Sequence, residues 1–117
     1  MVHVSRMERW LETPGLPERF FHPDELSEAL AKKHGVGLSL AARFAAKEAF
    51  GKAMGRGLAG IVLKDIMVRN SHNGKPEIFV FGTALAALEN SGGDRIHLSL
   101  SHERDNAIAV VVLENAV

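Results

Sequence analysis

Three residues near the middle of the chain have side chains and spacing suited to binding a phosphate with its metal ion. Residues 38–54 contain no proline and many alanines, which predicts one long helix because alanine has the highest helix propensity. A helix turns about 100° per residue, so Glu48, Gly51 and Lys52 fall in one sector of it. A carboxylate offers the oxygen ligands that Mg²⁺ prefers, a lysine attracts phosphate, and a glycine leaves the backbone accessible.

The same residues also fit a purely structural interpretation. Glu48 precedes Lys52 by four residues, which is the favourable order for an ion pair on a solvated helix and is worth a few tenths of a kcal/mol. Phe44 lies in the same sector, although an aromatic side chain on a helix is more often part of a core. Helical spacing alone therefore leaves both a phosphate site and a surface ion pair open.

The predicted helix resembles the signature of a known enzyme family. The sequence is similar to the bacterial holo-acyl-carrier-protein synthases, the small 4′-phosphopantetheinyl transferases, over Arg43-Phe44-Ala45-Ala46-Lys47-Glu48-Ala49 and Lys52-Ala53. Three more motifs follow in the order of that family and at similar spacing: Lys64-Asp65-Ile66, Asn73-Gly74-Lys75-Pro76 and Leu98-Ser99-Leu100-Ser101-His102. Residues 4–6 resemble the start of the family's first helix, so the resemblance covers nearly the whole chain.

The resemblance implies a transferase. It would move the 4′-phosphopantetheine group of coenzyme A to a serine of apo acyl carrier protein, with Mg²⁺ as cofactor, for fatty acid biosynthesis. Adenosine 3′,5′-bisphosphate would leave. The family forms trimers with active sites between subunits, so a homotrimer is expected. Two other classes stay open: a module that binds coenzyme A or carrier protein with little turnover, and a structural oligomerisation domain.

The resemblance also implies roles for residues of the helix. Glu48 would bind the metal ion, and Lys52 would hold an oxygen of the diphosphate. Gly51 and Gly55 would leave room for the phosphates. These four residues would form the centre of the active site.

Further contacts to coenzyme A and to the protein partner are implied in the same way. Arg43 and Phe44 match the family motif and are expected to contact coenzyme A. Lys47 would be either a second phosphate contact or one partner of a structural ion pair. Arg6, in the predicted first helix, would belong to the docking surface for the acidic recognition helix of acyl carrier protein.

The adenosine end of coenzyme A would lie at a predicted turn. Asn73-Gly74 is a strong hairpin signal because both residues tolerate positive φ. The resemblance adds that this loop would receive the adenosine, through Asn73, Gly74, Lys75 and Pro76. His102 would lie near the 3′-phosphate. The family often has threonine next, where this chain has Glu103. An acid beside a phosphate is unfavourable, so either Glu103 points away or the 3′-phosphate lies elsewhere.

One expected metal ligand is missing from the sequence. In the family, a short first strand with a Gly-x-Asp-Ile-like motif precedes the first helix, and its aspartate joins the helix glutamate at the metal. This sequence begins at Met1, where that strand would just have ended, so the N-terminal strand is expected to be missing. Either the true start lies upstream or the site works with one carboxylate. We expect the chain as given to be a poor catalyst that needs more Mg²⁺ than a version extended at its N-terminus.

Length and composition argue against several other classes of protein, among them nucleic-acid binders and membrane proteins. The 117 residues predict a single domain, 1–117, and 46% of them are apolar, as in ordinary globular proteins. The formal net charge of zero argues against a general nucleic-acid binder, which would be basic. The sequence has no cysteine, signal peptide or long apolar span, which predicts a cytoplasmic protein without disulfides or membrane contact.

Periodicity and turn signals predict the elements that must hold these residues in place. Helices are expected at residues 23–33, 38–54 and 83–90, and strands at 61–69, 78–81, 96–101 and 107–113. They predict an α+β fold in which the long helix packs on a small antiparallel sheet. Residues 107–113 are apolar at every position, so both faces of that strand should be covered, one of them by a partner subunit.

Overall fold

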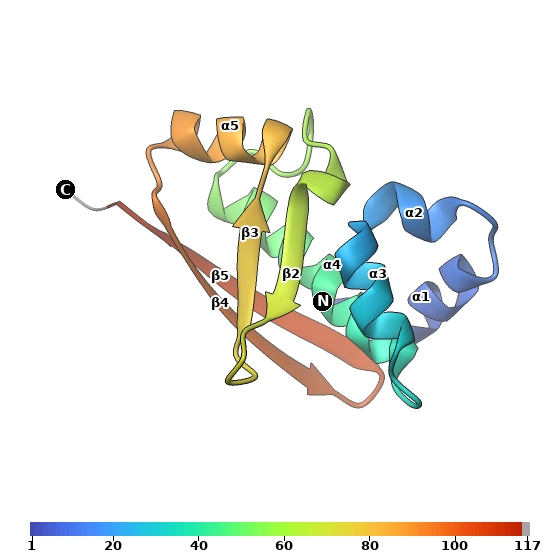
Figure 1. Cartoon of the computed structure of the whole chain (residues 1–117). Helices are drawn as coiled ribbons and strands as arrows, with labels where there is room; N and C mark the ends of the chain where they lie inside the picture. The colour runs from blue at the N-terminus through green and yellow to red at the C-terminus, as the bar shows by residue number, and fades with distance from the viewer. Residues whose placement is uncertain (116–117) are drawn as a thin grey trace.

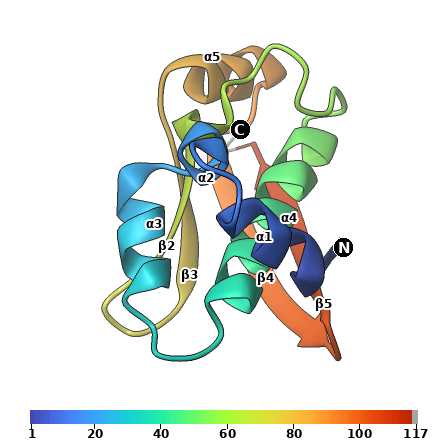
Figure 2. The same ribbon diagram turned by 90° about the vertical axis from the view of Figure 1, so that its right-hand side faces the viewer.

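The long helix α4 (Val36–Ala53) lies at the centre of the fold in the computed structural model, which describes residues 1–115 (Figure 1). The other helices are α1 (Val4–Leu11), α2 (Leu16–Phe20), α3 (Pro23–Leu30) and α5 (Gly82–Ser91), with a 3₁₀ turn η1 (Leu63–Asp65). The strands are β1 (Val2–His3), β2 (Ile66–Asn70), β3 (Pro76–Val80), β4 (Arg95–Glu103) and β5 (Asn106–Glu114). Helix α1 lies against α4, while α3 covers β2 (Figure 2).

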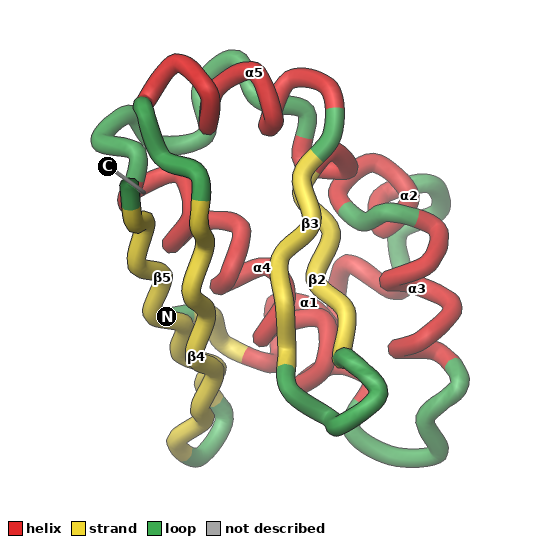
Figure 3. Tube along the Cα trace, turned by 60° about the vertical axis from the view of Figure 1, so that its left-hand side comes forward, coloured by secondary structure: helices red, strands yellow, loops and turns green. Residues whose placement is uncertain are grey.

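The strands form two antiparallel sheets that lie side by side against α4. One sheet has the order β1-β5-β4, and the other is the β2–β3 hairpin. Figure 3 shows the β2–β3 and β4–β5 pairs as neighbouring arms, with α4 behind them and α5 across one end. The predicted α+β fold is therefore confirmed, with the difference that the small sheet is divided in two.

The expectation of a missing N-terminal strand is wrong as stated. Val2 and His3 form β1, and they pair with Ala107 and Asn106 of β5. The backbone N–H of Val4 continues this attachment by donating to the carbonyl oxygen of Asp105 at 2.7 Å. Two residues suffice because Val2 is buried in the main hydrophobic cluster.

Small side chains along α4 let its neighbours approach closely. Ala41 and Ala45 are buried in a cluster with residues of α1, α3, β1 and β5. Ala46 packs against Val68 and Leu98, and so connects the helix to both sheets. Phe50 fills a separate cluster with Ile66, Ala84 and Leu88. Each large apolar side chain buried in this way contributes about 1.5–3 kcal/mol, so the helix that carries the candidate site residues is firmly held.

Asp65 of the Lys64-Asp65-Ile66 motif caps a helix. Its Oδ2 accepts hydrogen bonds from the backbone N–H of Thr83 at 2.8 Å and from the Thr83 hydroxyl at 2.6 Å. Those atoms belong to the first turn of α5, where backbone N–H groups lack partners within the helix. The motif therefore has a structural role here, which is to join η1 to α5.

Several predicted boundaries differ from the structure. Helix α3 ends at Leu30 rather than residue 33, and α2 was not predicted because residues 13–17 contain two prolines and a glycine. The strand expected from residue 61 begins at Ile66. The preceding residues form η1 instead, because the backbone and side chain of Asp65 are needed at the start of α5.

One face of β5 is uncovered within a single chain. Val110 is 57% exposed and Val112 is 54% exposed, while the alternate residues Ala107, Ala109 and Val111 pack inward. A single copy of the chain therefore covers only one face of β5, whereas the sequence led us to expect cover on both faces.

No helix within residues 1–115 is long and apolar enough to cross a membrane.

Candidate functional site

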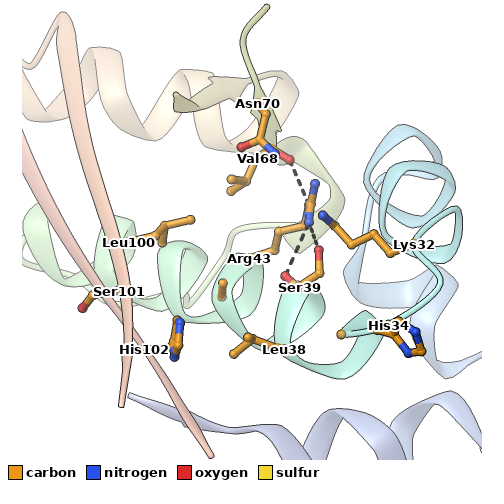
Figure 4. Close-up of a pocket in the computed structure, with 12 residues that line it drawn as sticks. Lys32, His34, Leu38, Ser39, Arg43, Val68, Asn70, Leu100, Ser101 and His102 are labelled. Carbon is orange, nitrogen blue, oxygen red and sulfur yellow. Dashed lines mark hydrogen bonds between the residues drawn. The ribbon is translucent and has the colours of Figure 1, made fainter. Parts of the chain in front are cut away.

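A cavity of about 330 Å³ lies where the N-terminal half of α4 meets the loop after α3 and the ends of β2 and β4 (Figure 4). It is lined by Lys32, His34, Gly35, Leu38, Ser39, Ala42, Arg43, Val68, Asn70, Leu100, Ser101 and His102. Four of these residues can carry positive charge, and none of them is acidic. The cavity is therefore suited to an anionic ligand.

Strand alternation explains how His102 reaches this cavity. Leu98 and Leu100 of β4 face the core, and His102 follows on the same side of the strand. Glu103 falls on the other side and is not among the lining residues. Glu103 is thus not a wall of this cavity, although Ser101 on the same side of β4 does line it, and the placement of the 3′-phosphate stays a prediction.

Arg43 forms a wall of the cavity and is 5% exposed. Its Nε donates to the carbonyl oxygen of Val68 at 3.1 Å, and its Nη1 donates to the hydroxyl of Ser39 and, at 3.5 Å, to the Ser39 carbonyl. Its Nη2 donates to Glu28 Oε1 at 2.7 Å. The protein thus holds a charged guanidinium in one orientation beside an open space.

Lys47 has a structural role, and its interpretation as a phosphate contact is wrong. The side chain is fully buried, and its Nζ donates to Glu25 Oε1 at 2.6 Å. It also donates to the carbonyl oxygens of Leu63 at 2.9 Å and Ile66 at 2.5 Å. Burial lowers the pKa of Lys47 below its usual value, and the carboxylate of Glu25 partly offsets this effect. The structural ion pair, which the sequence left open, is what forms.

Phe44 belongs to the core rather than to an open ligand surface. It is 5% exposed, and its ring meets Trp10 edge-on at 5.0 Å between centroids, with Phe20 at 6.3 Å. The guanidinium of Arg6 lies 5.1 Å from the centroid of the Phe44 ring and 4.9 Å from that of Trp10. The expectation that Phe44 contacts coenzyme A is therefore wrong. Its ring instead packs against the guanidinium of the half-buried Arg6.

Glu48 and Lys52 lie outside the cavity and do not form the surface ion pair that the sequence left open as an alternative. Within residues 1–115, neither side chain makes a hydrogen bond or an ion pair. Glu48 is half-buried and Lys52 is exposed. Because Glu48 follows Arg43 by five residues, the two point about 140° apart around α4. The structure therefore separates the residues expected at the metal and diphosphate from those expected at the 3′-phosphate.

The absence of a side chain at Gly51 makes room for the protein's own loop. A Cβ there would lie 2.7 Å from the carbonyl carbon and oxygen of Gly57 and 3.0 Å from Leu58. Backbone N–H groups of Arg56 and Gly57 donate to the Gly51 carbonyl, which fixes the loop at this place. The expectation that Gly51 leaves room for phosphates is corrected. Gly55, with φ of 77°, ends the helix in the left-handed conformation.

Gly51→Ala should destabilise the protein, although alanine is the better helix former. Helix propensity alone would add about 1 kcal/mol to the free energy of unfolding. The close backbone contact requires the loop to move, and such overpacking costs about 1–3 kcal/mol. Urea unfolding of both proteins measures the difference, with Ala53→Gly as a control for propensity at an exposed helix position. An increase in stability would show that the loop yields freely.

The predicted hairpin turn is confirmed. Gly74 has φ of 84°, and Asn73 Oδ1 accepts hydrogen bonds from the Ser71 hydroxyl and, at 3.2 Å, from the backbone N–H of Lys75. Lys75 and Pro76 line a groove between β3 and β4, and the turn begins just after the cavity residue Asn70. Contact of this turn with adenosine stays a prediction.

Sequence reasoning missed several residues of the cavity. Lys32, His34, Ser39 and Asn70 were not assigned to the site from the sequence, yet all four line the cavity. A usable signal was the concentration of basic residues in the loop directly before α4, at Lys32, Lys33 and His34. Glu25 and Glu28 were missed because their partners lie at least 15 residues away in sequence.

The sequence matches known proteins over nearly its full length. Residues 1–111 match the model of the 4′-phosphopantetheinyl transferase superfamily. The chain is 58% identical over 114 residues to the holo-[acyl-carrier-protein] synthase of Treponema denticola, with 97% of this chain and 93% of that protein covered.

Solved structures of similar proteins share the fold. A holo-[acyl-carrier-protein] synthase from Neisseria meningitidis superposes with a TM-score of 0.82 at 39% identity, covering 97% of this chain and 93% of that one. A holo-[acyl-carrier-protein] synthase from Helicobacter pylori in complex with coenzyme A superposes with a TM-score of 0.80 at 28% identity, covering 97% and 95%.

Proposed function

Because the chain belongs to the 4′-phosphopantetheinyl transferase superfamily, we propose that it moves the 4′-phosphopantetheine group of coenzyme A to a serine of apo acyl carrier protein. The serine hydroxyl attacks the phosphorus that carries pantetheine and loses its proton. A P–O bond to serine forms as the P–O bond to adenosine 3′,5′-bisphosphate breaks. The observation that carries this proposal is the 58% identity to the Treponema denticola synthase. The reaction is proposed to occur in the cytoplasm and to serve fatty acid biosynthesis.

The cavity beside Arg43 is the proposed site for the adenosine end of coenzyme A. The positive charges of Lys32 and Arg43 support binding of the 3′-phosphate there, since these groups donate charge-assisted hydrogen bonds, and the His102 ring offers a further N–H donor. The turn at residues 71–75 follows the cavity residue Asn70 directly, which supports contact between adenosine and this loop. Lys52 is proposed to hold the diphosphate because its ammonium has no partner within the described chain.

A complete active site is proposed to need more than one copy of the chain. Arg43 and Glu48 point about 140° apart around α4, so one copy presents its adenosine site and its metal site on different faces. Val110 and Val112 leave an apolar strip of β5 exposed, which supports an interface between copies. We therefore propose a homotrimer in which coenzyme A lies between neighbouring subunits.

Glu48 fits the role of a Mg²⁺ ligand. Its carboxylate offers hard oxygen atoms, and no protein group within residues 1–115 occupies them. The described residues contain no cluster of three or more histidine, aspartate or glutamate side chains that could hold a metal. Mg²⁺ binding would therefore rely on the substrate phosphates as well as on Glu48. When bound, the ion would neutralise charge that develops on the phosphate oxygens.

Mass spectrometry tests the proposed function directly. Apo acyl carrier protein is incubated with the purified chain, coenzyme A and Mg²⁺, and its mass is measured over time. We expect the carrier protein to gain the mass of phosphopantetheine. Binding of coenzyme A without any mass gain would contradict the transferase and leave a binding module.

Lys52→Ala should slow transfer while leaving the fold unchanged. Loss of a charge-assisted contact to the diphosphate should cost about 1.5–3 kcal/mol in binding or in the barrier, about 10-fold to 100-fold in kcat/KM. Lys64→Ala is a matched control, since Lys64 is also an exposed lysine. Steady-state kinetics of each variant measure the loss in transfer, and urea unfolding shows whether the fold is unchanged. Wild-type kinetics in folded Lys52→Ala would contradict the assignment.

Arg6→Glu should weaken docking of the acidic carrier protein and leave coenzyme A binding unchanged. The guanidinium of Arg6 lies against the rings of Trp10 and Phe44, which restricts its orientation, and the residue is only half-buried, so a partner can reach it. Charge reversal at such a position mainly slows association, by about tenfold at low salt, and added salt should reduce the difference. Stopped-flow association measures this effect, with the exposed Arg95→Glu as a control. Equal association rates for Arg6→Glu and wild type would exclude the docking role.

A further inference from the structure

A carboxylate lies directly against the arginine of the candidate cavity. Glu28 of α3 does not line the cavity, but its Oε1 accepts a hydrogen bond from Arg43 Nη2 at 2.7 Å. The side chain of Glu28 is 24% exposed and that of Arg43 is 6% exposed, so the pair is largely shielded from water. The contact is a charge-assisted hydrogen bond, which is stronger than one between neutral groups.

The same carboxylate also contacts the end of β2. Its Oε1 lies 3.4 Å from the backbone nitrogen of Asn70, and its Oε2 lies 3.4 Å from Arg69 Nε. Asn70 and Arg43 both line the cavity, whereas Arg69 does not. Glu28 therefore connects two walls of the cavity from outside it.

The guanidinium of Arg43 has little freedom to turn. Val68 holds Nε, Ser39 holds Nη1 and Glu28 holds Nη2, so each nitrogen has a partner in the protein. A guanidinium has five N–H groups, and the four hydrogen bonds made here leave one for a ligand. Recognition of a phosphate by arginine depends on the orientation of this planar fork.

We propose that Glu28 is a positioning residue, which holds Arg43 so that its remaining N–H faces a phosphate in the cavity. The inference rests on the proposed function, in which that phosphate is the 3′-phosphate of coenzyme A. Glu28 does not touch the ligand and acts through Arg43. Removal of Glu28 should therefore change the affinity only for ligands that carry the phosphate bound by Arg43.

A carboxylate beside a phosphate site has two opposing physical effects. Its negative charge repels the phosphate, which weakens binding, while its hydrogen bond fixes the arginine, which strengthens binding. The guanidinium lies between Glu28 and the proposed phosphate site, and its positive charge reduces the repulsion. The 2.7 Å hydrogen bond to Glu28 holds the guanidinium of Arg43 in its orientation. Positioning is therefore expected to dominate, and the two effects predict opposite signs on removal of Glu28.

The experiment compares coenzyme A with 3′-dephospho-coenzyme A, using calorimetric binding to the full chain. Glu28→Ala should weaken binding of coenzyme A about tenfold and change binding of the dephospho form less than about twofold. Glu28→Gln keeps an oxygen that can accept from Arg43, so it should recover most of the loss. Asp24→Ala removes a carboxylate from the same helix without contact to Arg43, and it should behave like the wild type.

A double-mutant cycle tests whether Glu28 acts through Arg43. In an Arg43→Lys background, Glu28→Ala should have little further effect on coenzyme A. Equal losses for both ligands would show a general structural role, and tighter coenzyme A binding in both Glu28 variants would show that repulsion dominates; either result overturns the proposal. Failure of the wild type to bind coenzyme A, or no effect of Arg43→Lys, would overturn the proposed function and its site instead.

Discussion

Lys47→Met should lower the free energy of unfolding by about 3–5 kcal/mol, the largest stability effect expected in this chain. The substitution leaves the carboxylate of Glu25 buried without its charge partner, since both side chains are fully buried. It also removes the hydrogen bonds that Lys47 donates to the carbonyl oxygens of Leu63 and Ile66, although the Leu63 oxygen still accepts from the backbone N–H of Ile66. Glu25 further accepts from the backbone N–H groups of His22 and Val68, so the pair joins α3, α4 and β2. Equilibrium unfolding in urea measures the loss.

Two variants separate charge burial from loss of a lysine in general. Lys52→Met changes an exposed lysine of the same helix and should alter stability by less than about 0.5 kcal/mol. Lys47→Met combined with Glu25→Gln removes the unpaired charge and should recover part of the stability. Equal stability of Lys47→Met and wild type would contradict the role of the buried pair.

The pH dependence of stability gives a further check on Lys47. Because burial lowers the pKa of this amine in the folded state, the unfolded state binds more protons between that pKa and the ordinary value of 10.5. The contribution of Lys47 to the free energy of unfolding therefore rises as pH increases from the folded-state pKa toward 10.5. It falls again as pH decreases toward and below the folded-state pKa. The difference in free energy of unfolding between the wild type and Lys47→Met should therefore grow as pH is raised, which urea unfolding along an alkaline pH series measures.

Local signals in the sequence predicted most of the fold. Alanine content predicted α4, Asn73-Gly74 predicted the β2–β3 hairpin, and apolar runs predicted β4 and β5 within two residues at each end. The errors occur where distant contacts decide the structure. Residues 61–65 are apolar enough for a strand, but Asp65 is needed by Thr83 at the start of α5. A capping partner 18 residues away leaves no local pattern.

The candidate site shows the same limit for individual charges. Lys47 and Lys52 lie on one helix, yet one is fully buried and the other exposed. Helical spacing gives their relative direction but not which direction faces protein, because that depends on the positions of Glu25 and β2. Gly51 was likewise noticed as unusual, but only the position of Gly57 shows that the space is filled by a loop.

Glu48→Gln should reduce transfer by about a hundredfold or more without loss of stability. A ligand to a metal ion on a transferring phosphoryl group is worth several kcal/mol in the transition state, and each 1.4 kcal/mol is tenfold in rate. The side chain has no partner within residues 1–115, so glutamine breaks no contact of the folded chain. Unfolding in urea should therefore match the wild type, in contrast to Lys47→Met.

Mg²⁺ dependence distinguishes metal binding from other roles of Glu48. Transfer by wild type, Glu48→Gln and Glu48→Asp is measured over a range of Mg²⁺ concentrations after removal of metal by a chelator. Glutamine should raise the concentration needed for half-maximal rate, and aspartate should keep part of the metal affinity because it keeps the charge. Glu89→Gln on α5 carries the same charge change away from α4 and should leave both parameters unchanged. A lower rate in Glu48→Gln with an unchanged Mg²⁺ requirement would remove Glu48 from the metal site, because a lost ligand must weaken the binding of the ion.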